Sequence, residues 1–210
     1  MKSYTRFVPQ ETFGVINNGS YGGVVYDFSG NLALSASVSG SISLWNIRQA
    51  QKIGHVSCEE FHYPYRLPGE VTILETNPFD KTLVAVGYSN GDVRLFDYIN
   101  KSLVSTLRGH RSAVTSLCFE KSSSQSMVLA SGSADSDIVL WDLVTFTGLC
   151  KLRGHKDAVT GLTFLTRESQ SLIVSVSKDT LLKVKVVYIY TLYIPIHTYM
   201  SDVSSLQKTT

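Results

Sequence analysis

Three residue types that together perform hydrolysis in many enzymes occur within one short stretch of this chain. His110, Ser131 and Asp135 are the histidine, serine and carboxylate of a nucleophilic triad. The same types recur at His155, Ser175 and Asp179, and the two histidines lie 45 residues apart. A catalytic site is not copied at a fixed interval, whereas a structural unit is. The repetition therefore favours a structural role over a hydrolase that uses His110 or His155.

A hydrogen-bonded network explains why these residue types repeat. An imidazole from the loop entering a unit is held by the turn carboxylate Asp135 and joins a strand hydroxyl, either Ser131 or Ser133. That hydroxyl accepts the indole N–H of Trp141. Such a network satisfies polar atoms that folding buries. We predict it in the third unit, and again through His155, Ser175 and Asp179 in the fourth.

Short alternating strands must position these residues. Each unit has a third strand that ends on an aromatic residue and a polar one, at Trp45-Asn46, Phe96-Asp97 and Trp141-Asp142. A second strand and a tight turn precede it, a first strand comes before those, and a fourth follows. Repeated units of four antiparallel strands are typical of β-propeller blades. We place the blades at 20–55, 71–107, 112–152 and an incomplete one from 157.

The chain accordingly divides into three parts. Residues 1–19 form an N-terminal segment that is a candidate strand for a closing blade, residues 20–184 form a partial propeller, and residues 185–210 form a hydrophobic and then polar tail. The fold class is thus all-β, an incomplete propeller of about three and a half four-stranded blades. A partial ring leaves two apolar blade faces open, which predicts poor solubility or oligomerisation.

The repeat pattern stops where the tryptophan of the fourth unit is due. Lys185-Val186 stand in place of Trp-Asp, and no repeat follows. A translated intron or mistaken gene model is the favoured explanation for this tail, and a genuine alternative product is the other. The apolar run Val186–Ile194 is shorter than the roughly 20 residues of a spanning helix, so a membrane-tethered form is disfavoured.

Composition excludes several classes of protein. A hydrophobic fraction of 43% with 17% charged residues excludes wholesale disorder, and a net charge of +2 leaves no footprint for non-specific nucleic-acid binding. Cys58, Cys118 and Cys150 have no metal-ligand spacing and are expected to be reduced thiols of an intracellular protein. The chain has no glycine-rich phosphate loop, zinc-protease motif or nucleophile elbow. We therefore expect no cofactor, no metal and no enzymatic activity.

Four basic residues flank the two Gly-His loops and form a candidate interaction patch. They are Arg108, Arg111, Arg153 and Lys156. If they share one face, they offer a site for RNA or an acidic peptide. Ordinary solvated loop charges are the alternative, and the low net charge favours it.

The units resemble WD40 repeats, cleanly at Trp141-Asp142 and in degenerate form at Trp45-Asn46 and Phe96-Asp97. Over about Met1 to Val184 the chain also resembles one family, the U3 small nucleolar ribonucleoprotein–associated WD-repeat proteins of the small-subunit processome (the DOM34-interacting protein 2, or WD repeat-containing protein 3, type). The segments that carry this resemblance are Lys2–Phe7, Phe13–Ile16, Ala85–Gly91, Ser131–Leu143 and Gly148–Asp157.

That resemblance implies a scaffold and not an enzyme. Members of the family have two tandem propellers and a helical region that joins partner WD-repeat proteins. They help assemble the nucleolar U3 particle that matures 18S ribosomal RNA. The implied role is a truncated form of this scaffold, in the nucleolus of the nucleus, with processome WD-repeat proteins and the U3 particle as partners and at most indirect or weak RNA contact. A WD40 adaptor of another pathway, such as a ubiquitin-ligase substrate receptor, is the alternative.

Overall fold

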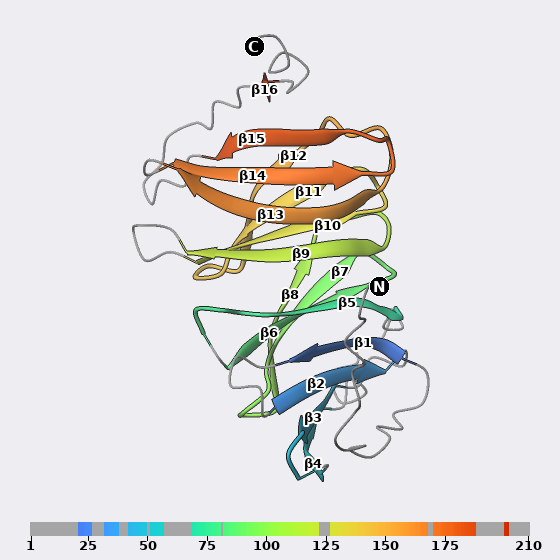
Figure 1. The fold of residues 1–210 in the computed structure, drawn as a ribbon, viewed down its shortest axis with the longest axis vertical. Coiled ribbons are helices and arrows are strands. Elements are labelled where there is room, and N and C mark those ends of the chain that lie inside the picture. Colours follow the sequence, from blue (N-terminus) through green and yellow to red (C-terminus); the bar gives the residue numbers. More distant parts are fainter. Residues whose placement is uncertain are drawn as a thin grey trace, which may run out of the picture.

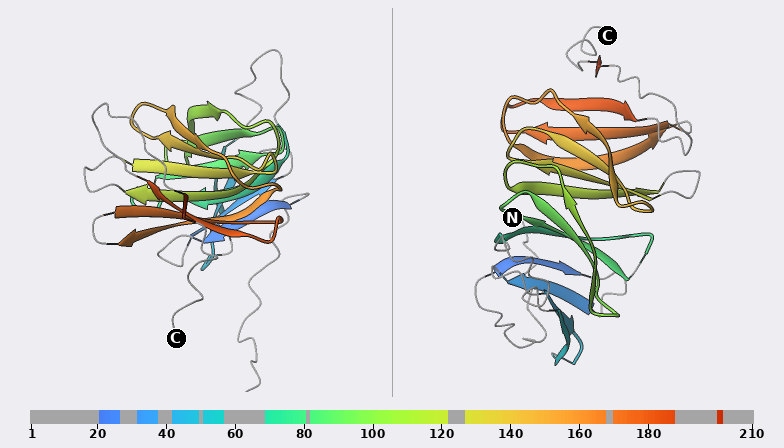
Figure 2. Two further views of the ribbon diagram at one scale, coloured as in Figure 1. Left: turned by 90° about the horizontal axis from the view of Figure 1, so that it is seen from above. Right: turned by 180° about the vertical axis from the view of Figure 1, so that it is seen from behind.

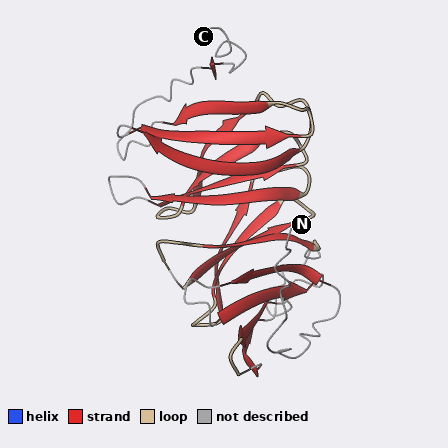
Figure 3. Ribbon diagram, in the orientation of Figure 1, coloured by secondary structure: helices blue, strands red, loops and turns tan. Residues whose placement is uncertain are grey.

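Alternating apolar and polar residues, rich in valine, isoleucine and threonine, make this chain a series of strands. The structure is a computed structural model that describes residues 21–26, 32–37, 42–49, 51–56, 69–80, 82–121, 127–167, 170–187 and 200–201. Every regular element within these ranges is a strand (Figure 3). The predicted N-terminal segment 1–19, residues 188–194 of the apolar run and most of the polar tail lie outside the described residues.

The first two sheets are four-stranded and antiparallel, with the strands in chain order. We call them blades 1 and 2. Blade 1 comprises β1 (Tyr21–Tyr26), β2 (Leu32–Ser37), β3 (Ile42–Asn46) and β4 (Gln51–Val56). Blade 2 comprises β5 (Val71–Thr76), β6 (Leu83–Tyr88), β7 (Asp92–Asp97) and β8 (Ser102–Arg108).

The next two sheets, blades 3 and 4, repeat this topology. Blade 3 comprises β9 (Val114–Lys121), β10 (Met127–Ser133), β11 (Ile138–Asp142) and β12 (Thr147–Leu152). Blade 4 comprises β13 (Val159–Arg167), β14 (Gln170–Ser177), β15 (Leu182–Val187) and β16 (Met200–Ser201). Its outermost strand therefore has only two residues.

The four sheets follow one another in an array, each against the next (Figure 1). The first strand of a blade contacts the first and second strands of the blade before it, as β9 contacts β5 and β6. Figure 2 shows the same succession from above and from behind. The predicted all-β class and incomplete propeller architecture are confirmed.

Apolar side chains fill the spaces between consecutive blades. Leu95 of blade 2 and Leu129 and Trp141 of blade 3 belong to one buried cluster. Ala130, Leu140 and Ile173 belong to the cluster between blades 3 and 4. The core is thus divided into layers, and each layer depends on two neighbouring sheets.

The register of the second and third strands is the same in all four blades. Trp45 lies opposite Ala33, Phe96 opposite Val84, Trp141 opposite Leu129 and Lys185 opposite Ile173. Lys185 therefore occupies the place that tryptophan takes in blades 1 and 3. The described residues contain no helix long and apolar enough to cross a membrane.

Candidate functional site

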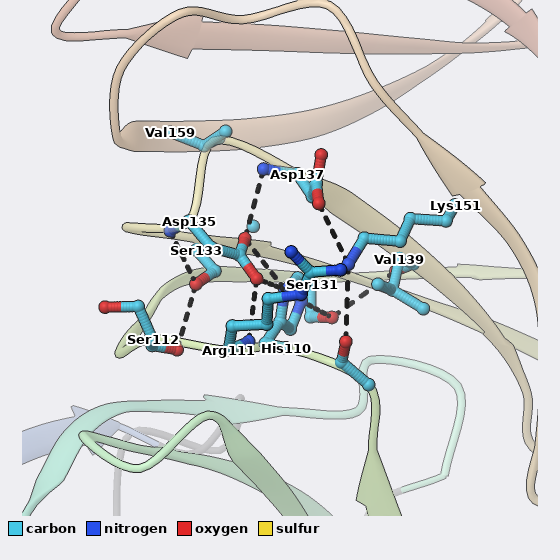
Figure 4. A network of polar contacts seen from close by, with 12 residues as sticks. His110, Arg111, Ser112, Ser131, Ser133, Asp135, Asp137, Val139, Lys151 and Val159 are labelled. Atoms are coloured by element: carbon cyan, nitrogen blue, oxygen red, sulfur yellow. Dashed lines mark hydrogen bonds and ion pairs between the residues drawn. The ribbon is translucent and has the colours of Figure 1, made fainter.

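The loop between β8 and β9 brings His110 against two residues of blade 3 (Figure 4). Its Nδ1 lies 3.2 Å from Oδ1 of Asp135, and its Nε2 lies 2.8 Å from Oγ of Ser131. Trp141 Nε1 donates to the same Ser131 oxygen at 2.8 Å. The structure thus joins four side chains from one loop, two strands and one turn.

The neutral form of His110 allows every polar atom of this network to be paired. Burial lowers the pKa of His110, and it outweighs the opposing effect of the nearby Asp135 carboxylate. In the neutral ring, Nδ1–H donates to Asp135, and Nε2 accepts from the Ser131 hydroxyl. Ser131 in turn accepts from the Trp141 indole, so donors and acceptors alternate along the network.

Asp135 also organises the turn between β10 and β11. It accepts hydrogen bonds from the backbone N–H of Arg111 at 2.8 Å and of Asp137 at 3.1 Å. Burial opposes its ionisation, but these two N–H groups and His110 outweigh burial and hold the Asp135 pKa below its ordinary value. Ser133, the alternative hydroxyl, donates to the carbonyl of Ser112 at 2.9 Å and so lies outside the network.

The distances match those of a hydrolytic triad, but both the histidine and the serine are enclosed by the fold. The side chain of His110 and the whole of Ser131 are 0% exposed. A nucleophile must reach a substrate, and the Ser131 oxygen is enclosed and already accepts the Trp141 N–H. What the arrangement does is tie the loop before β9 to the two middle strands of blade 3.

Blade 4 repeats the network without its tryptophan. His155 Nδ1 lies 2.9 Å from Asp179 Oδ2, and Nε2 lies 2.8 Å from Ser175 Oγ. Asp179 also accepts from the backbone N–H of Lys156 at 2.9 Å and of Leu181 at 3.0 Å. Burial raises the pKa of Asp179, but these hydrogen bonds and His155 lower it more, so the carboxylate stays ionised.

Two lysines occupy the space beside this second network. Lys185, 8% exposed, donates from Nζ to the carbonyl of Arg153 at 2.6 Å. Lys183 donates to the neighbouring carbonyl of Gly154. Burial, and then the positive charge of Lys183, lower the pKa of Lys185. The lysine stem fills part of the tryptophan's place, and the ammonium is held by the loop that enters the blade.

Blades 1 and 2 keep less of the network. Trp45 Nε1 donates to Ser35 Oγ at 2.8 Å, so blade 1 retains the tryptophan–serine half. In blade 2, Phe96 stands in the tryptophan position. There the guanidinium of Arg94 lies over the Tyr88 ring, with its Cζ atom 4.9 Å from the ring centroid. Among the described residues, the buried Nε of Arg94 has no hydrogen-bond partner.

Of the four basic residues, Arg108 ends β8, and Arg111, Arg153 and Lys156 lie on the two equivalent loops that enter blades 3 and 4. Arg108 lies 3.9 Å from Asp92, and Arg153 lies 4.0 Å from Asp137, so a carboxylate of its own blade offsets each charge. The exposed side chains of Arg111 and Lys156 form no ion pair within the described part of the chain. These two are the charges best placed for a partner.

One group of residues was missed from the sequence. Thr72, Thr115 and Thr160 are each the second residue of a first strand, after Val71, Val114 and Val159. Thr72 and Thr115 bond to the following blade. The repeated Val-Thr pair was a visible signal for this contact.

Across the described ranges, no three histidine, cysteine or acidic side chains form a metal-binding group.

Comparisons with known proteins agree with this geometry. Residues 101–142 match the family described as WD domain, G-beta repeat. The chain is 32% identical over 135 residues to U3 small nucleolar RNA-associated protein 12 of Saccharomyces cerevisiae, covering 60% of this chain and 14% of that protein. It is 32% identical over 114 residues to the WD repeat-containing protein 3 homolog of Dictyostelium discoideum, covering 54% of this chain and 11% of that protein.

A solved structure shares the fold. The structure of U3-55K superposes with a TM-score of 0.67 at 23% identity, over 80% of this chain and 49% of that chain. At this identity the likeness concerns the fold alone. The chain spans about an eighth of the length of the curated relatives that it matches, at 14% and 11%.

Proposed function

Because the chain carries a WD40 repeat domain, we propose that it is a scaffold, part of a nucleolar small-subunit processome component that acts in 18S ribosomal RNA maturation. The observation that carries the proposal is the 32% identity over 135 residues to a U3 small nucleolar RNA-associated protein. The expected partners are other WD-repeat processome proteins and the U3 particle. The expected location is the nucleolus.

Absence of catalysis is part of this proposal. WD40 repeat proteins are generally non-enzymatic scaffolds, and both His–Ser–Asp groups here have buried serines, at 0% exposure for Ser131 and 4% for Ser175. We assign both groups to holding the entry loop of each blade. Rigid loops at one end of a propeller then present the binding surface.

The basic loop residues are the proposed contact surface. Arg111 and Lys156 occupy the same place in successive blades, next to the histidine that fixes each loop. Their backbone N–H groups are held by Asp135 and Asp179, so each side chain starts from a fixed point. A partner carrying phosphate or carboxylate groups fits two cations presented in this way.

Affinity purification of the tagged full chain tests the proposal. We expect WD-repeat processome proteins to be recovered with the chain. We also expect U3 RNA to be enriched relative to an unrelated small nucleolar RNA. Recovery of cullin-type partners without U3 RNA would support the ubiquitin-ligase adaptor in place of the processome scaffold.

A charge-reversal pair locates the contact. Arg111→Glu with Lys156→Glu should reduce U3 recovery. Arg48→Glu is the matched control, because Arg48 is exposed in the β3–β4 turn at the opposite end of the blades. Equal recovery from the charge-reversed chain and the control would place the contact elsewhere.

A further inference from the structure

The turns between the second and third strands of blades 2, 3 and 4 share one backbone conformation. Gly91, Ser136 and Thr180 have positive φ angles of 88°, 68° and 67°. The residue after each of them donates its backbone N–H to a side-chain oxygen two positions earlier. These donors and acceptors are Asp92 and Asn90, Asp137 and Asp135, and Leu181 and Asp179. The three turns can therefore be compared residue by residue.

Blades 2 and 3 carry a carboxylate at the last position of this turn, and it pairs with a cation of the same blade. Oδ1 of Asp92 lies 3.9 Å from Nε of Arg108. Oδ2 of Asp137 lies 2.8 Å from Nζ of Lys151 (Figure 4), and its Oδ1 lies 4.0 Å from Nε of Arg153. These carboxylates thus offset the cations near the end of the fourth strand.

Blade 4 has an exposed leucine at the position of this carboxylate. Leu181 is 46% exposed. It shares a side of the third strand with Lys183 and Lys185, whose ammonium groups reach carbonyls of the loop that enters blade 4. The next residue, Leu182, belongs to the opposite side, which is the open face at the end of the array. Leu181 is therefore not part of that open face.

Two exposed lysines lie beside Leu181. Lys156 belongs to the loop that enters blade 4, and its backbone N–H donates to Asp179 at 2.9 Å. Lys178 belongs to the turn, and its backbone N–H donates to the carbonyl of Ala158 in the same loop at 2.9 Å. The loop and the turn are thus held together, and the two lysine side chains and the leucine start from fixed backbone positions.

The positions equivalent to Lys178 carry no charge. They are Ser89 in blade 2 and Ala134 in blade 3, and each makes the same backbone hydrogen bond to the chain that enters its blade. Blade 4 therefore has a cation and an exposed leucine where the other two blades have a small residue and a carboxylate.

The acidic side chains of this loop and turn are engaged by backbone N–H groups. The side chain of Asp179 is 6% exposed and accepts from the N–H groups of Lys156 and Leu181. Asp157 is exposed, and its Oδ1 accepts the N–H of Ala158. Within the described part of the chain, neither Lys156 nor Lys178 forms an ion pair. Their ammonium groups are thus available to the carboxylates of a partner.

We propose that Lys156, Lys178 and Leu181 bind a protein segment that carries aspartate or glutamate side chains beside an aliphatic residue. The carboxylates of the segment pair with the two ammonium groups, and its aliphatic side chain covers Leu181. This proposal rests on the proposed scaffold function and names the chemistry of a partner for the same loop surface.

The same residues fit a protein better than RNA. Proteins that bind single-stranded RNA supply aromatic or arginine side chains on which bases stack. Leu181 offers an aliphatic side chain, and both cations are lysines, which act as point charges. Contact with phosphate groups alone would leave the exposed leucine without a partner.

Fluorescence anisotropy with labelled synthetic probes tests this chemistry on the full chain. The probes are a peptide that repeats Asp-Asp-Leu, a peptide that repeats Asp-Asp-Ser, and single-stranded oligouridine of the same total charge. We expect the leucine peptide to bind about 5-fold more tightly than the serine peptide, because its leucine buries part of Leu181. Equal binding of the two peptides, or tighter binding of oligouridine, would overturn the proposal.

Variants of the chain locate the contact. Leu181→Ser should weaken binding of the leucine peptide by about 5-fold and leave binding of the serine peptide unchanged. Lys156→Ala and Lys178→Ala should each weaken binding of both peptides by about 3-fold. Leu165→Ser is the matched control, because Leu165 is 52% exposed in β13 of the same blade. An equal loss from Leu165→Ser and Leu181→Ser would mean that the peptide binds the open face, which would overturn the proposal.

Affinity purification of the same chain separates this proposal from the scaffold function. If the chain recovers U3 RNA and processome proteins but binds the two peptides equally, the partner chemistry is wrong and the scaffold function stands. If the chain prefers the leucine peptide through Leu181 but recovers neither U3 RNA nor processome proteins, the peptide site stands and the scaffold function is wrong.

Discussion

Lys185 donates from its ammonium to the carbonyl of Arg153 at 2.6 Å, from the register position that Trp141 occupies in the preceding blade. The two side chains fill equivalent positions in their blades with different contacts. The indole of Trp141 contributes apolar area and one N–H to Ser131, whereas the lysine contributes a stem and a charge held by a loop carbonyl. The fourth blade therefore keeps its strand pairing without its tryptophan.

Replacing Lys185 with tryptophan should stabilise the chain. The indole N–H would donate to the Ser175 hydroxyl, and an apolar ring would replace a buried ammonium. Burial already disfavours that ammonium, because it lowers the pKa of Lys185. We expect a gain of about 1 kcal/mol in the free energy of unfolding. Lys185→Met is the matched control, because it keeps the stem and lacks the N–H. Urea unfolding measures both, and a tryptophan variant less stable than the methionine one would contradict the assignment.

Removing His110 should destabilise the protein without removing a specific activity. His110→Ala leaves the Ser131 hydroxyl and the Asp135 carboxylate without their partner in a buried site. The expected cost is about 2 kcal/mol. Arg111→Ala, at an exposed neighbour, should change stability by less than about 0.5 kcal/mol. Equal urea midpoints for the His110→Ala and native proteins would show that the network does not support the fold.

Stability should fall as the pH drops through the range where histidine titrates. Burial lowers the pKa of His110, so below about 6.5 the unfolded chain binds more protons at this residue than the folded one. The stability that the neutral His110 contributes is complete above about pH 6.5. It is lost as the pH falls through the lowered pKa of His110 in the folded protein. His110→Gln should flatten the dependence of stability on pH below about 6.5.

A second loss of stability should follow in more acidic solution. The pKa values of Asp135 and Asp179 are lowered in the folded protein, so their contribution is present above about pH 4 and is lost below it. Chemical unfolding at a series of pH values measures this phase. It should persist in the His110→Gln variant because Asp179 keeps its own hydrogen bonds. Its disappearance in that variant would mean that His110 alone causes the acid sensitivity.

The two described cysteines should react slowly with alkylating reagents. Burial raises the pKa values of Cys118 and Cys150, which reduces the thiolate that attacks such reagents. In a Cys58→Ser background, we expect iodoacetamide at pH 8 to modify the folded protein at least about 10-fold more slowly than the urea-unfolded one. Mass spectrometry follows the reaction. Equal rates would show that the thiols are accessible.

The strands and the network could be predicted because both follow local sequence rules. The alternation of valine, leucine and serine indicates each strand, and the recurrence of His110 and Asp135 at His155 and Asp179 indicates the repeat. The choice between Ser131 and Ser133 needed the structure. Both project from the same side of β10, and only the register with β11 places Ser131 beside the indole.

The contacts between blades could not be predicted, because they depend on how separate sheets approach each other. The repeated Val-Thr pair marks Thr115 as part of the repeat, but the pair does not specify that its hydroxyl reaches Val159 of another sheet. Likewise, the sequence alone suggests that a lysine in place of tryptophan disrupts the fourth blade, whereas β14 and β15 are paired in the structure. The ammonium contact of Lys185 with Arg153 depends on a loop that precedes it by 32 residues.

The succession of sheets, each against the next, has a consequence for how the molecule comes apart. The principal contacts between sheets join neighbours, β1 with β5, β5 with β9 and β9 with β13. Unfolding of an end sheet therefore leaves the other interfaces in place, so unfolding can proceed inward from the ends of the array. The middle sheets, enclosed on both sides, would be the last to lose their structure and the first from which it could regrow.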